Sequence, residues 1–117
     1  MKPYDVGKNI SEVKIKKRVV ASVTGGMNMS TRAFYEKIGL QDEKLFMYSD
    51  EVDMAIRAKK AGFIMAATSE VKSWHQHINP GNKQLRNNYA PFLGSRNKVY
   101  LAKKHFGIIR GIIQFFY

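Results

Sequence analysis

The chain has 117 residues, with 20 Lys and Arg against 9 Asp and Glu, a formal net charge of +11 and no cysteine. The length suits one small domain or part of one, and 44% hydrophobic residues are enough for a packed core, which excludes wholesale disorder. The lack of cysteine excludes disulfides and zinc–thiolate sites, and no apolar run resembles a signal peptide or a membrane-spanning helix, so we expect a cytoplasmic protein.

The first part of the chain predicts a loop followed by one strand. Residues 1–18 are polar and show no hydrophobic period, so we interpret them as a linker. The β-branched run Val19–Thr24 then predicts a short buried strand that ends at Gly25 and Gly26. Backbone without a Cβ atom at these two glycines can approach a ligand closely.

Two helices are expected in the middle of the chain. Ser30 or Thr31 can cap a short helix that ends at Gly39. Ser49 is a candidate N-cap for a longer helix that runs to about Ala61 and is terminated by Gly62. The predicted core face of this longer helix holds three residues: Val52, Ala55 and Ile56.

The remaining predicted elements are two strands and a further helix. Phe63–Ala67 and Val71–Trp74 have strand character, which gives a β-α-β-like run and predicts an α/β or α+β fold. A helix is expected from near Pro91 to about Phe106, ended by Gly107. The aromatic and aliphatic residues expected on or near its core face are Phe92, Val99, Tyr100 and Phe106.

The end of the chain combines positive charge with apolar residues. No acidic residue follows Glu70, so the last part is purely cationic and suits polyanions of any kind. Residues 108–117 are too apolar for an ordinary solvated tail and too few to span a bilayer. At helical spacing their isoleucines form a stripe, which predicts either packing against further helices or contact with a membrane surface.

Three carboxylates crowd the first turn of the longer helix: Asp50, Glu51 and Asp53. Acids are favoured there by the helix dipole and the free N–H groups, which is a sufficient structural explanation for one or two of them. The dipole also lowers their pKa values, unless burial or mutual repulsion raises one again. The alternative is a catalytic cluster facing a cavity, with Arg57 placed to pair with Asp53 one turn later.

Two histidines, His75 and His77, flank Gln76 at the end of the last predicted strand, Val71–Trp74, and would point to the same side. Packed or surface histidines are one interpretation. A metal site is the other, and with imidazole, carboxylate and diphosphate oxygens it would suit Mn²⁺ or Mg²⁺.

Several segments together resemble the second half of the catalytic domain of family 2 glycosyltransferases. Their order and spacing match over about Val19 to His75, and the helix around Arg96 and Asn97 is similar to the helix that follows in bacterial members. The matching segments are Thr24–Met29, Phe34–Glu43, Phe46–Met54, Arg57–Phe63 and Trp74–His75.

The resemblance implies a GT-A fold, in which a nucleotide-binding half with a DxD metal motif precedes an acceptor-binding half. Only the second half is recognisable: residues 19–78 match its catalytic portion, and residues 86–117 match basic C-terminal helices. We therefore expect a fragment, a truncated product or a split enzyme that is inactive alone, with a possible partner chain supplying the missing half.

Site roles follow from the same resemblance. Glu51 takes the position of the catalytic base, where many members have Asp, so Asp50 remains the alternative. His75 matches a histidine that helps hold the divalent metal, Mn²⁺ or Mg²⁺, on the nucleotide diphosphate. The implied substrate-binding residues are Gly25, Gly26, Asp53 and Arg57, with a structural role as the alternative for the last two.

The implied reaction is an inverting transfer of a sugar from a nucleotide-sugar donor to a glycan or lipid-linked acceptor, as in bacterial cell-envelope polysaccharide synthesis. It would take place at the inner face of the plasma membrane. Two non-catalytic alternatives arise from the charge: a membrane-surface module, and a nucleic-acid-binding module that uses aromatic and basic residues of the last helix. We expect the nucleic-acid role less, because those aromatic residues are better used as core.

Overall fold

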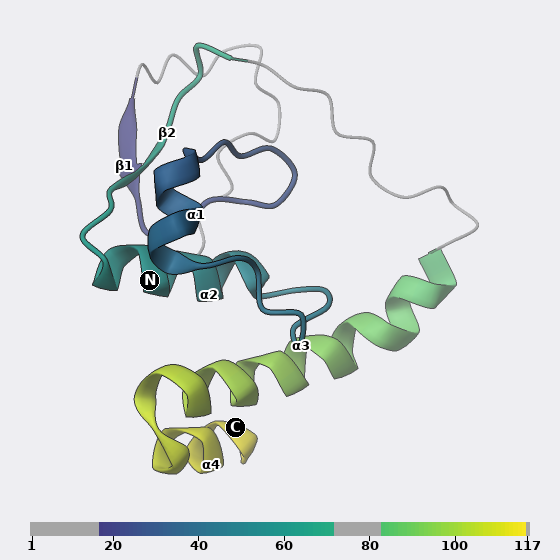
Figure 1. Cartoon of the computed structure of the whole chain (residues 1–117). Helices are drawn as coiled ribbons and strands as arrows, with labels where there is room; N and C mark the ends of the chain where they lie inside the picture. Colours follow the sequence, from purple (N-terminus) through teal and green to yellow (C-terminus); the bar gives the residue numbers. More distant parts are fainter. Residues whose placement is uncertain (1–16, 72–82, 117) are drawn as a thin grey trace.

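The computed structural model of the chain describes residues 17–71 and 83–116 and has an α+β arrangement in these ranges (Figure 1). In chain order its elements are β1 (Arg18–Val20), α1 (Arg32–Ile38), α2 (Asp50–Lys60), β2 (Met65–Ala67), α3 (Lys83–Phe106) and α4 (Ile108–Phe115). Of the two classes that the sequence predicted, α/β and α+β, the described residues have the α+β class, with helices and one small antiparallel sheet. The small sheet, α1 and α2 lie on one side of α3, and α4 lies on its other side (Figure 1).

The sheet is smaller than expected, because β1 and β2 pair antiparallel over three residues each, with Val20 opposite Met65. The strand predicted over Val19–Thr24 is therefore wrong beyond Val20, and it is not buried, because Val19 is 71% exposed. After the ladder ends the chain turns, and the Thr24 carbonyl accepts a hydrogen bond from the Asn28 side chain at 3.2 Å. Of the strand predicted over 71–74, Val71 lies in a bend and the rest is outside the described residues.

Helix α1 has the ends that the sequence predicts. Thr31 is the N-cap, and its hydroxyl accepts a hydrogen bond from the Phe34 backbone N–H at 3.2 Å. Gly39 ends the helix with a φ of 78°, a left-handed value at which a Cβ atom would be strained. The ring of Phe34 packs edge-on against Phe63 with centroids 5.2 Å apart, which holds α1 against the chain that follows α2.

Helix α2 begins at Asp50, as expected, but the predicted capping by the Ser49 side chain is wrong. Ser49 has a left-handed φ of 67° and its side chain makes no cap hydrogen bond. At the other end the Gly62 N–H bonds to the Lys59 carbonyl and the Phe63 N–H to the Ala58 carbonyl, which is a Schellman ending. Because Phe63 is used in this way, β2 starts two residues later than predicted.

Helix α3 begins at Lys83, eight residues before the predicted start at Pro91, which lies inside it. Five of the eight residues before Pro91 have good helix propensity, namely Lys83, Gln84, Leu85, Arg86 and Ala90, and the helix continues through the proline with the loss of one backbone hydrogen bond. The end at Gly107, with a φ of 93°, is confirmed. The predicted core face is wrong for Phe92 and Phe106, which are 63% and 64% exposed, whereas Val99 and Tyr100 are half-buried.

The buried stripe of α3 is instead formed by Leu93, Asn97 and Leu101 at four-residue spacing. The other buried apolar residues in the described ranges are Leu45 and the small residues Ala55 and Ala58 of α2. Val52, expected in the core, is 43% exposed. Two buried polar residues, Asp53 and Asn97, complete a core that is therefore partly polar.

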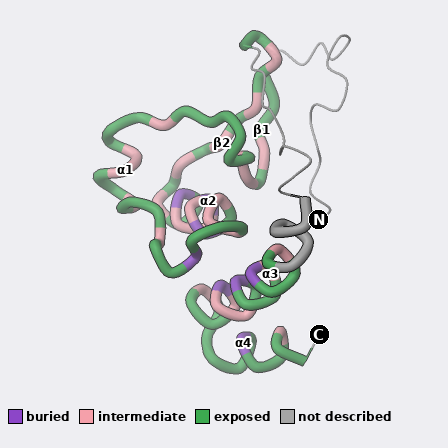
Figure 2. Tube along the Cα trace, turned by 90° about the vertical axis from the view of Figure 1, so that its right-hand side faces the viewer, coloured by how far each residue is buried: buried purple, intermediate pink, exposed green. Residues whose placement is uncertain are grey.

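Helix α4 folds back on α3 after Gly107 and packs closely through Gly111, which is buried. A Cβ atom at Gly111 would lie 2.9 Å from the Cβ atom of Lys103, so only glycine permits this approach without a shift. Figure 2 shows α4 as a mostly exposed outer layer. In the ranges that the structure describes, no helix combines the length and apolar character needed to cross a bilayer.

Candidate functional site

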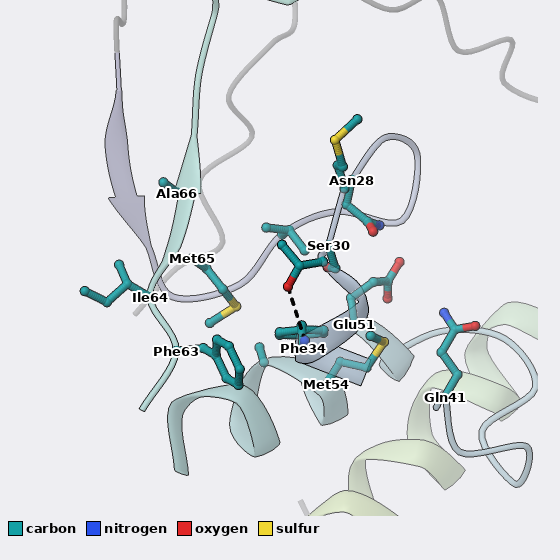
Figure 3. A pocket seen from close by; sticks show the side chains of 14 residues that line it. Asn28, Ser30, Phe34, Gln41, Glu51, Met54, Phe63, Ile64, Met65 and Ala66 are labelled. Carbon is teal, nitrogen blue, oxygen red and sulfur yellow. Dashed lines mark hydrogen bonds between the residues drawn. The ribbon is translucent and has the colours of Figure 1, made fainter. Parts of the chain in front are cut away.

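A cavity of about 230 Å³ opens beside the N-terminal half of α2 (Figure 3). Its walls come from the loop before α1, from α1 and α2 themselves, and from the chain that enters β2. Most of the lining is apolar, with a few polar side chains. The lining residues that matter below are Asn28, Ser30, Phe34, Gln41, Glu51, Met54, Phe63 and Met65.

Glu51 is the acidic residue among those that line this cavity. Its carboxylate accepts hydrogen bonds from its own backbone N–H and from the backbone N–H of Gly25. A Cβ atom at Gly25 would lie 2.2 Å from Oε1 of Glu51, so the missing side chain lets the carboxylate lie against the loop. Gly25 therefore positions Glu51, while Gly26 lies exposed beside it.

The pKa of Glu51 is raised. Burial is the largest cause, and the hydrogen bond and negative charge of neighbouring Asp50 add to it, against the lowering effect of the two backbone N–H groups. Burial and repulsion thus raise the pKa of Glu51 more than the N–H groups at the helix N-terminus lower it. The sequence alone left open which of these effects is larger. A carboxylate with a raised pKa is a stronger base than an ordinary one.

The side chains of Asp50 and Asp53, in the same helical turn, do not point into the cavity as Glu51 does. The Oδ2 atom of Asp50 accepts a hydrogen bond from Nε2 of Gln41 at 3.1 Å. Asp53 is fully buried on the side that faces α3, and Asp50 is not among the residues that line the cavity, so the three acids do not face this cavity as a cluster. Of the two candidates for a base, Glu51 has the pocket position.

The turn that leads into α2 is held in an unusual conformation. Phe46, Tyr48 and Ser49 have φ values of 55°, 68° and 67°, and left-handed backbone costs roughly 1–2 kcal/mol at each non-glycine residue. The side-chain amide of Asn97 is 1% exposed and donates hydrogen bonds to the carbonyls of Leu45, Met47 and Tyr48 at 3.0, 2.8 and 2.7 Å.

Arg96 strengthens this clamp from the neighbouring position on α3. Its guanidinium donates to the carbonyls of Lys44 and Leu45 at 2.8 and 3.1 Å, and to the Asn97 side-chain oxygen. The pair Arg96 and Asn97 thereby fixes the start of α2, and with it the direction of Glu51. We call Arg96, Asn97 and the three carbonyls that Asn97 binds the α3 clamp.

Asp53 is the centre of a buried charge cluster. Its carboxylate contacts Arg57 at 2.8 Å, Lys104 Nζ at 2.8 Å and His105 Nε2 at 2.7 Å. Burial alone would raise the pKa of Asp53, but the hydrogen bonds from Lys104 and His105 and the charge of Arg57 outweigh it and lower the pKa. The predicted Asp53–Arg57 pair is confirmed.

Arg57 also binds the chain between α1 and α2. Its guanidinium donates to the backbone carbonyls of Ile38 and Gly39, and to that of Leu40 at 2.9 Å. Asp53 and Arg57 therefore use their polar atoms inside the protein. Of the two roles that the sequence left open for this pair, these contacts favour the structural one.

Asp42 joins the same network from the loop. Its carboxylate accepts hydrogen bonds from Lys104 Nζ at 2.6 Å and from the Tyr100 hydroxyl at 2.7 Å, and both hold the pKa of Asp42 well below its usual range. The same contact with Asp42 raises the pKa of Tyr100. Burial would lower the pKa of Lys104, but its hydrogen bonds to Asp42 and Asp53 raise it.

The metal site expected at His75 lies outside the residues that the structure describes. His75 and His77 lie outside them, and among residues 17–71 and 83–116 no group of three or more His, Asp or Glu could hold an ion. The metal roles inferred for His75 therefore stay predictions.

The sequence did not indicate the polar contacts of Asp42, Tyr100, Lys104 or His105, and Tyr100 was expected only as a core aromatic residue. These residues are up to 62 positions from their partners, so no local pattern connects them. Asn97 had a weak signal of its own, because it is a polar residue halfway between Leu93 and Leu101 on one helical stripe.

Comparison of the chain with protein-family models, with curated proteins and with solved structures finds no match in any of the three. The geometry described above and the resemblance in sequence are thus the observations on which a function can be argued.

Proposed function

We propose that this chain forms the acceptor-binding side of an inverting family 2 glycosyltransferase of GT-A type, with Glu51 as the general base. One observation carries the proposal: Glu51 lies at a cavity, is held by the Gly25 backbone and has a raised pKa. The order and spacing of the sequence segments supply the reaction class. The acceptor would be a hydroxyl group of a glycan or of a lipid-linked saccharide.

The proposed step asks little of the chain beyond one base. Glu51 takes the proton of the acceptor hydroxyl as that oxygen bonds to the anomeric carbon of the donor sugar. The bond from the anomeric carbon to the diphosphate breaks, and the nucleoside diphosphate leaves with the electron pair. The raised pKa matters because it makes Glu51 accept the proton more readily than an ordinary glutamate.

The cavity walls suit a saccharide. Phe34 and Phe63 provide aromatic rings, and Met54 and Met65 provide adaptable apolar surface, against which the C–H face of a sugar can pack. Asn28 and Gln41 point polar groups toward the same space from the loops that flank it (Figure 3). Such a mixture of apolar floor and few polar groups is typical of small-ligand pockets.

The described residues are not proposed to bind the nucleotide-sugar donor. Mn²⁺ or Mg²⁺ would offset charge on the leaving diphosphate, but the described residues do not form a set that fits this ion, so no step is derived through it. The proposal places the nucleotide-binding half outside the described residues, or on a partner chain.

Saccharide binding is the direct test. A panel of neutral mono- and disaccharides is titrated into isotopically labelled chain, and amide and side-chain signals of Asn28, Gln41 and Glu51 are expected to shift by NMR. The Asn28→Ala variant should bind more weakly, whereas Glu36→Gln, an exposed change on α1, should bind like the parent. Absence of any shift across the panel would count against the proposed pocket.

The role of Glu51 is tested by turnover in a preparation that also contains the nucleotide-binding half. Glu51→Gln is expected to lower the rate by roughly a hundredfold or more, since removing a general base costs about that much. Saccharide binding should be kept, because glutamine fills the same space. The same amide change at exposed Glu36 is the control, and an equal loss of turnover at both positions would remove Glu51 as the base.

A further inference from the structure

An exposed apolar face covers the outer side of α4, away from the proposed active site. Helical geometry places Ile109 and Ile113 almost opposite Gly111, the residue that contacts α3. Ile109 is 72% exposed and Ile113 is 47% exposed, and Phe116 at the end of the helix is 78% exposed. We call Ile109, Ile113 and Phe116 the outer α4 face.

The groove between α3 and α4 extends this apolar surface. It is lined by Val99, the stem of Lys103, Ile108, Gly111, Ile112 and Phe115. Ile108 and Phe115 are 61% and 72% exposed, so the side of α4 next to α3 is not covered either. Contiguous exposed apolar surface of this kind marks a site of interaction, because single scattered residues would not form a continuous strip.

The charged side chains that the structure describes on α3 and α4 are all positive. Lys98, Lys103 and Arg110 are exposed on α3 and α4, and no acidic residue occurs in the chain after Glu70. Arg110 lies three positions before Ile113 and thus about 60° from it around the helix, so it falls beside Ile113 at one edge of the apolar strip. An apolar strip bordered by cations complements an anionic lipid surface, whose acyl region takes the isoleucines and whose head groups pair with Lys and Arg.

Size and residue type favour lipid over other occupants. A helix of eight residues is about 12 Å long and about 10 Å wide, so its outer face is far smaller than the roughly 800 Å² per partner of a stable protein interface. Single-stranded nucleic acid binds by stacking on aromatic rings, and the centre of this face is isoleucine.

We propose that the α3–α4 hairpin anchors this chain to an anionic membrane surface, with α4 lying in the plane of the interface. The outer α4 face enters the boundary between head groups and acyl chains, and Lys98, Lys103 and Arg110 contact lipid phosphates. The anchor uses none of the residues of the proposed active site, so it stands apart from the proposed activity.

Vesicle sedimentation tests the anchor with the full chain. The chain is expected to sediment with vesicles of phosphatidylcholine mixed with phosphatidylglycerol, much less with phosphatidylcholine alone, and to be released as salt increases. The double variant Ile109→Ser with Ile113→Ser should bind roughly tenfold more weakly or worse, because two large apolar side chains are lost. Arg110→Gln should weaken binding about fivefold.

The matched control is Val19→Ser with Leu40→Ser, which changes two side chains that are 71% and 76% exposed away from the hairpin. It should bind like the parent, and so should Glu51→Gln, which keeps this test separate from the proposed catalysis. Should circular dichroism show that the double isoleucine variant is unfolded, Phe116→Ser at the helix end takes its place.

Three results would overturn the anchor. The first is no binding to anionic vesicles, and the second is equal binding by the parent and the isoleucine variant. The third is a different occupant: a dimer in sedimentation velocity, or retention of a single-stranded oligonucleotide, that the isoleucine changes abolish while vesicle binding is absent.

Discussion

Glu51 and Asp53 are two residues apart on α2 and have opposite environments. Two helical positions correspond to about 200° of rotation, so the two side chains point to opposite faces of the helix. Glu51 lies at the cavity with a raised pKa, whereas Asp53 is buried among cations with a lowered pKa. The same residue class in the same helical turn therefore serves a site on one face and the core on the other.

Exchanging the two carboxylates for amides should separate these roles in stability. Asp53→Asn leaves Arg57 and Lys104 without their buried counter-charge, so the free energy of unfolding should fall by about 3 kcal/mol or more. Glu51→Gln should leave it within about 1 kcal/mol of the parent, because burial and repulsion already disfavour its charge. Urea unfolding followed by circular dichroism measures both. A smaller loss for Asp53→Asn than for Glu51→Gln would contradict this assignment.

Asp50 should set part of the proton affinity of Glu51. Removing its charge with Asp50→Asn should lower the pKa of Glu51 toward the ordinary value of a glutamate, although burial still holds it above that value. The side-chain carbonyl carbon of Glu51, followed by NMR across the acid range, reports the change directly. Glu43→Gln, an exposed change in the preceding loop, is the control. An unchanged Glu51 titration in Asp50→Asn would show that burial alone raises the pKa.

At the scale of elements, α3 is the part that holds the start of α2 in place. The left-handed residues Phe46, Tyr48 and Ser49 are unfavourable by themselves, so the turn needs contacts from outside it. The α3 clamp supplies these contacts through one buried amide and one guanidinium. Helix α3 thus positions Glu51 from about 46 residues further along the chain, without touching the cavity.

Asn97→Ala should release this turn. Three backbone carbonyls lose their donor, and the free energy of unfolding should fall by about 2–4 kcal/mol. Ser95→Ala, an exposed change on the same helix, should be nearly neutral. Hydrogen exchange of the amides at 45–51 should quicken in Asn97→Ala more than exchange in α1. Uniform quickening across the chain would mean that Asn97 supports general stability and does not hold the turn in particular.

At the scale of the whole molecule, the charge network around Asp42 and Asp53 connects segments that are far apart in the chain. Lys104 joins Asp42 of the loop to Asp53 of α2, and Tyr100 and His105 add contacts from the same helix. The described core contains few large apolar side chains, so these polar contacts carry a large share of the tertiary structure.

This network should make the chain sensitive to acid. Asp42 and Asp53 have lowered pKa values when folded, so below about pH 5 the unfolded chain binds more protons than the folded chain. The contribution of these two carboxylates to the free energy of unfolding is therefore expected to be complete above their unfolded pKa values and to be lost as pH decreases through their folded pKa values. Asp42→Asn should flatten this decline, as measured by urea unfolding at a series of pH values.

Glu51 should have the opposite effect on the pH dependence of the free energy of unfolding. Its raised pKa means that the folded chain binds more protons there, so its contribution is lost as pH rises through the folded value. Glu51→Gln should thus steepen the decline toward acid relative to the parent. A decline that is identical in the parent, Asp42→Asn and Glu51→Gln would show that other groups govern the acid response.

The sequence by itself determined the local parts of this protein. Thr31, Gly39, Gly62 and Gly107 mark helix ends correctly, because capping depends on backbone groups within about four positions. Glu51 was selected as the candidate base through the resemblance in sequence, because the acidic cluster after Phe46–Ser49 lies within one short segment that can be matched residue by residue. The tail was expected to form an apolar stripe, and α4 has one.

Only the tertiary structure decided which side of each helix is buried. Periodicity predicted that the aromatic residues Phe92 and Phe106 lie in the core. In the structure the face with Asn97 points inward instead, because Asn97 binds the left-handed turn and Lys104 of the same helix pairs with Asp42 and Asp53. Pairs separated by 50 residues or more leave no periodic pattern, because their attraction depends on distances that exist only after folding. The buried charge cluster results from that choice of orientation.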